Sequence, residues 1–469
     1  MQPQSQNPSL VRGLGLTAAI SVNIANMIGT GVFLKSRVMT CNVGDAQTVL
    51  FVWIFAGLLS MAGALAYSEI AAMMPEAGGD YVFLRRAYGR PVSFIYGWTF
   101  FAIAKAGSQA ALAVGFAIFL NDAMGGTLQQ VFWRGDLLGH TFEIGTLTLV
   151  ALFAIWLVAL INCAAVTVGG YTASLLTVLK IATVLAVAGG CILFARGDWA
   201  HLAMSNVGGA CEGVAASARG GIAGLGAAML GALWAYDGWN NVAPLAGEVK
   251  NPQRNIPRAF LGGMVVVGTL YVLANAAYYY VLTPTEIANV SATSSVAAEV
   301  IKRFLGPTAT LVMSIALLIS SFGALHASVL ANSRIPYAMA KEGLFFKPLA
   351  QVSERSRVPV KAILAQAAWA SVVAASGTYD ALTDSVIFAS WLFYGLTTAS
   401  LFIFRRTLPN QERPYRAWGY PVVPVLFLLV TAWLIVNTFL ATPTQALTGV
   451  ALMALGIPFY WFWTRAARS

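Results

Sequence analysis

The chain has 469 residues, of which 58% are hydrophobic and only 10% carry a charged side chain, compared with about 25% charged residues in an average soluble domain. A soluble fold could not bury so much apolar surface, so the composition excludes a soluble protein and indicates one embedded in a membrane. The formal net charge of +10 gives no support to nucleic-acid binding, because the basic residues follow membrane topology.

Apolar runs recur along the whole chain, and we interpret twelve of them as transmembrane helices, since about 20 helical residues cross a ~30 Å hydrocarbon core. No linker or low-complexity segment divides them, so we predict one all-α, polytopic domain over residues 1–469, with residues 1–10 disordered. The predicted spans are 14–34, 48–73, 93–120, 144–162, 171–195, 222–246, 259–282, 308–340, 362–376, 383–404, 422–441 and 446–463.

Basic residues are unevenly divided between the two sets of loops that twelve spans create. Nineteen of the 28 Lys and Arg residues fall on the side that carries both termini, and seven fall on the other side. Because basic residues in short loops are retained in the cytoplasm, we expect a multi-pass protein of the inner membrane with both termini cytoplasmic. The excess charge also suits contact with anionic lipid headgroups of the bilayer.

The four cysteines give a weak signal. Cys163 and Cys191 lie at span ends, whereas Cys41 and Cys211 fall in loops that this topology places outside. An external disulfide between Cys41 and Cys211 is one alternative. The interpretation we favour is four unpaired, small hydrophobic residues.

Two predicted spans contain polar and flexible sequence at mid-depth. The first contains the segment IGTG at residues 28–31, and the sixth contains DGWNN at residues 237–241. Such sequence is costly in a bilayer unless the freed backbone faces a cavity or a ligand. Paired breaks at corresponding positions indicate the substrate site of an inverted-repeat transporter, so spans 1–5 and 6–10 form two halves. The alternative for each break is that its glycine only allows close helix packing.

Two broken helices offer both kinds of backbone group that an α-amino acid needs. Free N–H groups at the start of one half-helix favour a carboxylate, since the helix dipole is positive there. Free carbonyl groups at the end of the other half-helix accept hydrogen bonds from an ammonium group. The pattern therefore predicts a zwitterionic substrate held between helix ends.

Five segments, in order along nearly the whole chain, resemble the amino acid–polyamine–organocation transporters, and within them the L-type and bacterial amino acid permeases. They are residues 28–33 (IGTGVF), 67–81 (YSEIAAMMPEAGGDY), 235–240 (AYDGWN), 247–257 (GEVKNPQRNIP) and 333–343 (SRIPYAMAKEG). The resemblance implies a leucine-transporter-type fold. Its two inverted repeats of five helices are expected at residues 11–195 and 222–405, with broken helices 1 and 6, and two extra helices at residues 422–463.

The resemblance also implies how the substrate is held. Backbone amides of Gly29, Thr30 and Gly31, with the Thr30 hydroxyl, would bind the carboxylate. Trp234 would close over the substrate from outside, or alternatively fill the bundle core. The ammonium-binding carbonyls are expected on Met27, Trp234 and Asp237. The full predicted substrate-binding set is Met27, Ile28, Gly29, Thr30, Gly31, Trp234, Ala235, Asp237 and Trp239.

Lys180 lies about 20 Å along the fifth span, which is too deep for its ammonium group to reach either interface. By the resemblance, it occupies the place where sodium-coupled relatives of the same fold keep a sodium ion. We therefore expect sodium-independent transport, with Lys180 as a structural or coupling residue. The alternative is a misjudged helix boundary and a lysine that reaches the interface.

Lys105, Gln109 and Asn240 are candidate pathway residues. Lys105 either lines the pathway or pairs structurally within the bundle. Asp237 either selects cationic side chains or caps the broken helix, and we favour the cap. Charged residues near the cytoplasmic side form either an inner gate of ion pairs or a solvated face. They are Glu248, Lys250, Arg254, Arg258 and Arg334.

We predict a secondary active amino acid transporter of the cytoplasmic membrane that works by alternating access, either as an exchanger or as a proton-coupled symporter. The alternatives are a polyamine or amine transporter of the same superfamily and a transporter-derived nutrient sensor. An enzyme, a cofactor and a bound metal are not expected, since the three histidines are scattered and form no ligand cluster. Residues 121–143 contain no cysteine, so the disulfide that joins L-type transporters to an accessory heavy chain cannot form there. We therefore expect no accessory heavy chain.

Overall fold

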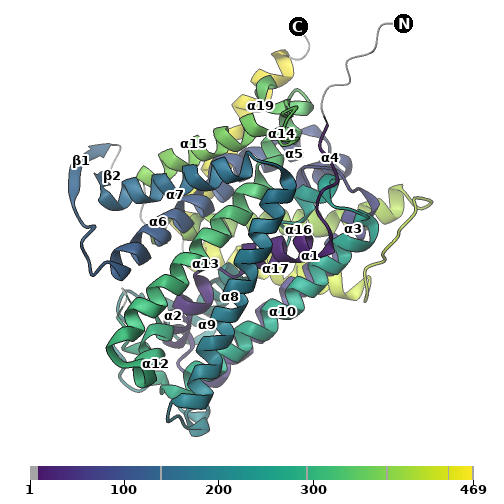
Figure 1. Ribbon diagram of the computed structural model, residues 1–469. Helices are drawn as coiled ribbons and strands as arrows, with labels where there is room; N and C mark the ends of the chain where they lie inside the picture. The colour runs from purple at the N-terminus through teal and green to yellow at the C-terminus, as the bar shows by residue number, and fades with distance from the viewer. Residues whose placement is uncertain (1–8, 138–139, 292–293, 377–378, 442, 467–469) are drawn as a thin grey trace, which may run out of the picture.

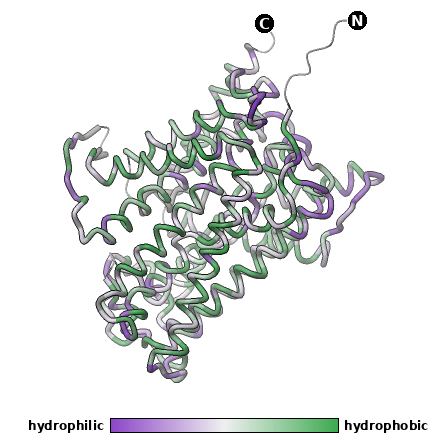
Figure 2. The backbone as a smooth tube through the Cα atoms, in the orientation of Figure 1, coloured by the Kyte–Doolittle hydropathy of each residue, from purple (hydrophilic) through white to green (hydrophobic). Residues whose placement is uncertain are grey.

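The computed structural model describes residues 9–137, 140–291, 294–376, 379–441 and 443–466, and it is a bundle of long helices (Figure 1). Hydrophobic residues follow the helices along their length, while hydrophilic stretches gather toward the ends of the bundle (Figure 2). The first described residues and the last helix lie on the same end, which we call the terminal face. The disorder expected for residues 1–10 falls mostly on residues 1–8, which lie outside the described residues.

Seven helical segments among the described residues are long and apolar enough to cross a membrane. They are Leu16–Val43, Ala46–Met73, Arg90–Ala123, Val166–Phe194, Pro252–Val281, Ala309–Lys341 and Val422–Leu440. Three shorter apolar helices, Thr146–Asn162, Gly221–Tyr236 and Val360–Ser376, add to them. The mostly helical, polytopic architecture therefore agrees with the sequence-based expectation.

The first part of the chain begins with an interrupted helix. Its two pieces, and the helices that follow, are α1 (Leu16–Met27), α2 (Gly31–Val43), α3 (Ala46–Met73), α4 (Asp80–Tyr88), α5 (Arg90–Thr99), α6 (Lys105–Ala123), α7 (Thr146–Asn162) and α8 (Val166–Phe194). Asp45 separates α2 from α3, because its side chain caps α3 by accepting a hydrogen bond from Thr48 N at 2.7 Å. A π-helical turn, Phe100–Ala104, joins α5 to α6 and ends directly before Lys105. Such turns are frequent at functional sites.

The second part contains the other interrupted helix. It consists of α9 (Gly221–Tyr236), a 3₁₀ turn (Ala243–Glu248), α10 (Pro252–Val281), α11 (Pro284–Ala288), α12 (Val296–Leu305), α13 (Ala309–Asn332), α14 (Arg334–Lys341), α15 (Val360–Ser376), α16 (Tyr379–Thr407), α17 (Val422–Ala441), α18 (Pro443–Ala454) and α19 (Gly456–Ala466). The last predicted span, 446–463, is thus two helices. Pro458 accounts for the interruption, since it has no N–H to donate to the carbonyl of Ala454.

A two-stranded antiparallel hairpin corrects the all-α prediction. Strands β1 (Val131–Leu137) and β2 (His140–Gly145) join α6 to α7 and project from the side of the bundle (Figure 1). Aromatic and β-branched residues at 131–133 favour a strand. The two long apolar runs on either side of this segment dominate the hydropathy pattern, so the short strands between them are not evident from the sequence.

Cys41 and Cys211 form a disulfide, with 5.6 Å between their Cα atoms. The favoured expectation of four unpaired cysteines was therefore wrong for this pair, whereas Cys163 and Cys191 are free. Cys41 also lies within α2 and not in a loop. The bridge links the far end of α2 to the segment that precedes α9, so it joins the two interrupted helices on the side away from the terminal face.

Candidate functional site

The two interrupted helices meet inside the bundle. A Cβ atom placed on Gly31 would lie only 2.6 Å from the Cβ of Ala235, so α2 and α9 approach so closely that only glycine fits. Gly238 has a φ of +96°, a conformation that favours glycine, and it packs against Asn26. The side-chain amide of Asn241 donates to Asn26 Oδ1 at 2.8 Å. The two breaks are therefore in direct contact, which agrees with the prediction that they form one site.

A small cavity of about 30 Å³ lies between the breaks. This volume is room for about one water molecule, so an amino acid fits only if the surrounding helices separate. Seven of the nine predicted substrate-binding residues line the cavity: Met27, Gly29, Thr30, Gly31, Trp234, Ala235 and Asp237. Asn26, Ser108 and Leu112 also line it, and none of these three is among the predicted site residues.

Helix ends of both polarities surround this cavity. α2 starts at Gly31. The N–H groups of Phe33 and Leu34 donate to Thr30 O at 3.1 Å, whereas those of Gly31 and Val32 have no carbonyl within the helix to donate to. α1 and α9 end at the cavity with their carbonyl groups. Two of those carbonyls accept from their own chain, Met27 O from Gly29 N at 2.8 Å and Trp234 O from Asp237 N at 3.1 Å. The site thus presents a positive helix end opposite two negative ones.

Lys180 binds the end of α1 from the middle of α8. Its ammonium group donates to Ala25 O at 2.8 Å and to Ile28 O at 2.5 Å, and the side chain is 1% exposed. The lysine therefore stays buried and does not reach an interface. Ser320 of α13 donates to Gly29 O at 2.8 Å. Ile28 therefore contributes to the site through its carbonyl group, and it does not line the cavity.

Tyr271 of α10 connects the two breaks, and sequence reasoning missed it. Its buried hydroxyl lies 2.7 Å from Met27 O and 2.9 Å from Ala235 O, so one proton is shared between the ends of α1 and α9. The only signal in the sequence is a tyrosine at mid-depth in an apolar helix. That signal does not separate it from Tyr278 and Tyr279 of the same helix.

Asp237, at the end of α9, already has partners. The hydroxyl of Tyr394 donates to Asp237 Oδ1 at 2.6 Å, and the ammonium group of Lys105 lies 3.4 Å from Oδ2. Lys105 is 1% exposed and its Nζ lies 5.3 Å from the centre of the Phe100 ring. The negative charge of Asp237 is therefore balanced within the bundle, and Lys105 pairs with it instead of lining the cavity.

The other candidate residues lie away from the cavity. Gln109 Nε2 donates to Ser328 Oγ of α13 at 3.3 Å. The Trp239 ring packs against Tyr67, with 4.7 Å between ring centres. Asn240 points toward α4, a helix that lies outside the predicted transmembrane spans. Trp239 and Asn240 hold the second break in place, whereas Gln109 joins α6 to α13, and none of the three lines the cavity.

Asp80, the first residue of α4, holds the second break. The side-chain amide of Asn240 donates to Asp80 Oδ2 at 2.8 Å, and the hydroxyl of Tyr96 donates to the same oxygen at 3.2 Å. The carboxyl group is 1% exposed. Burial raises the pKa of the Asp80 carboxyl to about 7, against the lowering effects of its hydrogen bonds and of Lys105. A group that titrates near neutral pH thus touches the unwound segment.

The sequence model for amino acid permeases matches residues 14–463, almost the whole chain. The chain belongs to the amino acid permease family. The b(0,+)-type amino acid transporter 1 of Homo sapiens is 29% identical to it over 97% of this chain and 89% of the human protein. The serine/threonine exchanger SteT of Bacillus subtilis (strain 168) is 28% identical, over 97% of this chain and 98% of its own.

A third relative is the large neutral amino acids transporter small subunit 2 of Homo sapiens, which is 28% identical over 96% of this permease and 80% of its own length. All three names describe carriers of amino acids, and one describes an exchanger. The permease is accordingly a member of a family of membrane transporters, and the expectation that it is not an enzyme is confirmed by these relatives.

On the side of the terminal face, a buried ion pair joins the 3₁₀ turn that follows the second break to the start of α14. Arg334 at the start of α14 forms two hydrogen bonds to Glu248, at 2.7 and 2.9 Å, and neither side chain is exposed. The backbone of Glu248 also accepts from Leu14 N at 3.0 Å, next to the start of α1. Of the charges considered for an inner gate, these two are paired, while Arg254 and Arg258 are exposed.

Proposed function

We propose that this permease is a sodium-independent, secondary active transporter that carries amino acids by alternating access. The observation that carries the proposal is the cavity where the start of α2 meets the ends of α1 and α9. The substrate carboxylate binds the first-turn N–H groups of α2, and its ammonium group binds carbonyls of Met27, Trp234 and Asp237. Trp234 lies over the substrate on the side away from the terminal face.

Lys180 supports the sodium independence of transport. Its ammonium group lies among the carbonyls of Ala25 and Ile28, where its positive charge holds the end of α1 against α8. The protein thus supplies that cation itself, and no bound sodium ion is needed for the helix contact.

Alternating access follows from the small size of the cavity. An amino acid enters only when helices separate on one side, and each side has an identifiable closure. On the terminal face the buried Arg334–Glu248 pair must open. On the other side Trp234 must move, while the Cys41–Cys211 disulfide keeps the neighbouring ends of α2 and the segment before α9 together.

The topology proposed from the sequence is consistent with this arrangement. It has twelve spans, inverted repeats at residues 11–195 and 222–405 and two further helices within residues 422–463, with both termini in the cytoplasm of a bacterial inner-membrane protein. The matching breaks and the position of both ends of the described chain on one face support it. The connection between α6 and α7 forms a hairpin without a cysteine, which supports a carrier that works without an accessory heavy chain.

Of the two possible couplings, we favour exchange of one amino acid for another, because one relative is named as an exchanger. The test is uptake of labelled amino acids and polyamines into sodium-free proteoliposomes of the purified protein, with and without amino acid inside. Internal amino acid should accelerate uptake of an α-amino acid, and an imposed pH gradient should not drive it. Uptake of polyamines alone, or binding without uptake, would contradict the proposal.

A further inference from the structure

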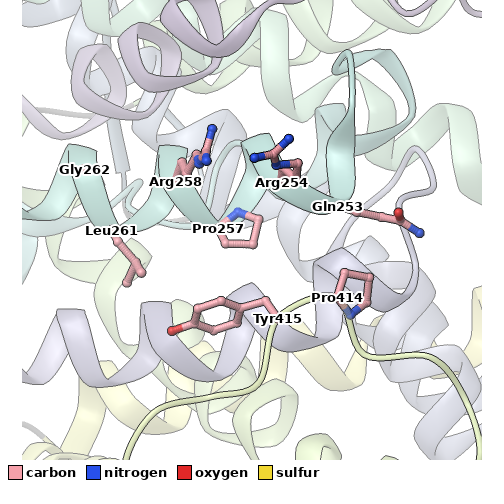
Figure 3. A pocket seen from close by; sticks show the side chains of 8 residues that line it. All are labelled: Gln253, Arg254, Pro257, Arg258, Leu261, Gly262, Pro414 and Tyr415. Carbon is pink, nitrogen blue, oxygen red and sulfur yellow. The ribbon is translucent and has the colours of Figure 1, made fainter.

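A second cavity, of about 440 Å³, opens on the terminal face, between the first turns of α10 and the segment 408–421 that joins α16 to α17 (Figure 3). We call it the basic groove, defined by Arg254, Arg258, Leu261 and Tyr415. Figure 3 shows Leu261 on the side of α10 that faces the Tyr415 ring, with both arginines on another edge of the same helix. No residue lines both this groove and the substrate cavity.

The two arginines of the basic groove have no protein partner within the described part of the chain, and both are exposed. By contrast, Arg334 and Arg405 on the same face each pair with a carboxylate, at 2.7 Å in both cases. Arg254 and Arg258 are one helical turn apart, a spacing at which like charges destabilise a helix. An anion bound between them would relieve that repulsion.

The floor of the basic groove is apolar and continues toward the middle of the bundle. Leu261 is partly buried, and Val265 one turn further along α10 is 59% exposed. From Arg258 to Val265 the helix rises about 10 Å. Along this side of α10 a basic surface is thus followed by an apolar one. A ligand with an anionic head and an apolar chain fits this order.

The opposite wall is fixed in place rather than a loose loop. Glu69 of α3 accepts a hydrogen bond from Ala417 N at 2.6 Å and pairs with Arg405 at 2.7 Å. Arg413 donates to Leu408 O at 2.8 Å within the same segment. These bonds hold the segment that carries Tyr415 against the bundle.

We propose that the basic groove binds one anionic phospholipid, whose phosphate lies between Arg254 and Arg258 and whose acyl chain runs along Leu261 and Val265. Guanidinium groups bind phosphate oxygens through paired hydrogen bonds, and basic pockets between helices at the membrane surface suit anionic headgroups. The neighbouring residue Ala259 accepts from Asn23 of α1 at 3.1 Å. The lipid thus lies on the same turn of α10 that contacts the interrupted helix.

The test is lipid binding by the full-length protein in detergent, measured by native mass spectrometry during titration with phosphatidylglycerol or phosphatidylcholine. Arg254→Ala/Arg258→Ala should weaken binding of one phosphatidylglycerol by about 30-fold, since each arginine near a charged surface contributes a factor of about five. The matched control is Arg355→Ala/Arg357→Ala, which removes two exposed arginines from the segment before α15. That control should bind as the unmodified protein does.

Leu261→Trp provides a second, independent variant, because it fills the groove without changing its charge. It should also weaken phosphatidylglycerol binding, and soluble glycerol phosphate should not compete. Equal losses in the two double-alanine variants would show that only the general charge of the face matters, and would overturn the proposal. Unchanged binding in Arg254→Ala/Arg258→Ala, or competition by glycerol phosphate, would overturn it too. Neither measurement needs a transported substrate, so the result is independent of the proposed transport function.

Discussion

The two breaks that form the cavity are held by different chemistry. The break between α1 and α2 is fixed through its backbone carbonyls, which accept from Lys180, Ser320 and Tyr271. Apart from Ala235 O, which accepts from Tyr271, the break after α9 is fixed through side chains, since Asp237 and Asn240 bind groups on α6, α16 and α4. The first break is therefore attached to the bundle by one cation and two hydroxyls. The second depends on two carboxyl groups, and burial raises the pKa of one of them, Asp80, to about 7.

This difference indicates that the two breaks have different roles. The first break keeps the N–H groups of Gly31 and Val32 at the cavity, because Lys180 and Ser320 hold the carbonyl groups of Ala25, Ile28 and Gly29. The second break can respond to protonation at Asp80, which contacts Asn240. Substitutions that affect one break and spare the other test this comparison.

The largest effect is expected at Lys180. Lys180→Met leaves the buried carbonyls of Ala25 and Ile28 without this donor, and an unpaired buried acceptor costs about 1–3 kcal/mol. Exchange in proteoliposomes should therefore fall by about 30-fold or more. Lys105→Met, which removes the buried lysine of α6 that pairs with Asp237 of the second break, should cost less. A larger loss in Lys105→Met than in Lys180→Met would break the comparison.

Tyr271→Phe should have the next largest effect, because it removes the hydroxyl that joins Met27 O to Ala235 O. We expect exchange to fall about tenfold, from the loss of about 1–2 kcal/mol in hydrogen bonding. The matched control is Tyr278→Phe in the same helix, since the buried Tyr278 hydroxyl has no partner among the described residues. Equal losses in the two variants would show that the bridge is unimportant.

The Lys105–Asp237 pair should show a smaller and non-additive effect. Asp237→Asn or Lys105→Met alone leaves one buried charge without its partner, and each should slow exchange about fivefold. The double substitution should be no slower than the worse single one, since it removes both charges together. Initial uptake rates of the four proteins measure this coupling. Strictly additive losses would mean that the two residues act separately.

The smallest effect is expected in the pH dependence of stability at Asp80. The pKa of this carboxyl rises from 3.8 to about 7 on burial, so the folded protein retains a proton between these values that the unfolded chain has lost. Its stabilising contribution is complete below pH 4 and is lost as pH rises to 7. The melting temperature should therefore fall by a few degrees from pH 5 to pH 8, and fall less in Asp80→Asn. An identical decline in both proteins would contradict this assignment.

The sequence predicted the parts of the site that leave a local pattern. Glycines and polar residues inside apolar runs marked the breaks at residues 28–31 and 237–241, and the depth of Lys180 in its span marked a buried charge. The structure brings seven of the nine proposed substrate-binding residues to one cavity. These features could be found because an apolar span makes any polar interruption conspicuous.

Long-range partners left no such pattern. Cys41 and Cys211 are 170 residues apart in sequence, and only the fold brings their Cα atoms within bonding distance. Tyr271 resembles the other tyrosines of α10 until its hydroxyl is placed between two helix ends. Asp80 was part of a recognised segment, but its contact with Asn240 across 160 residues depends on the packing of α4. Pairing of this kind requires the folded chain.

The central claim is that the start of α2 and the ends of α1 and α9 bind the carboxylate and ammonium groups of an α-amino acid. The most direct test is competition in the exchange assay between a transported amino acid, its methyl ester and the amine that lacks the carboxyl group. We predict that the free amino acid competes fully and that neither derivative competes at tenfold excess. Competition by the amine as strong as that of the amino acid would contradict the claim, because the helix end that binds the carboxylate would then have no role.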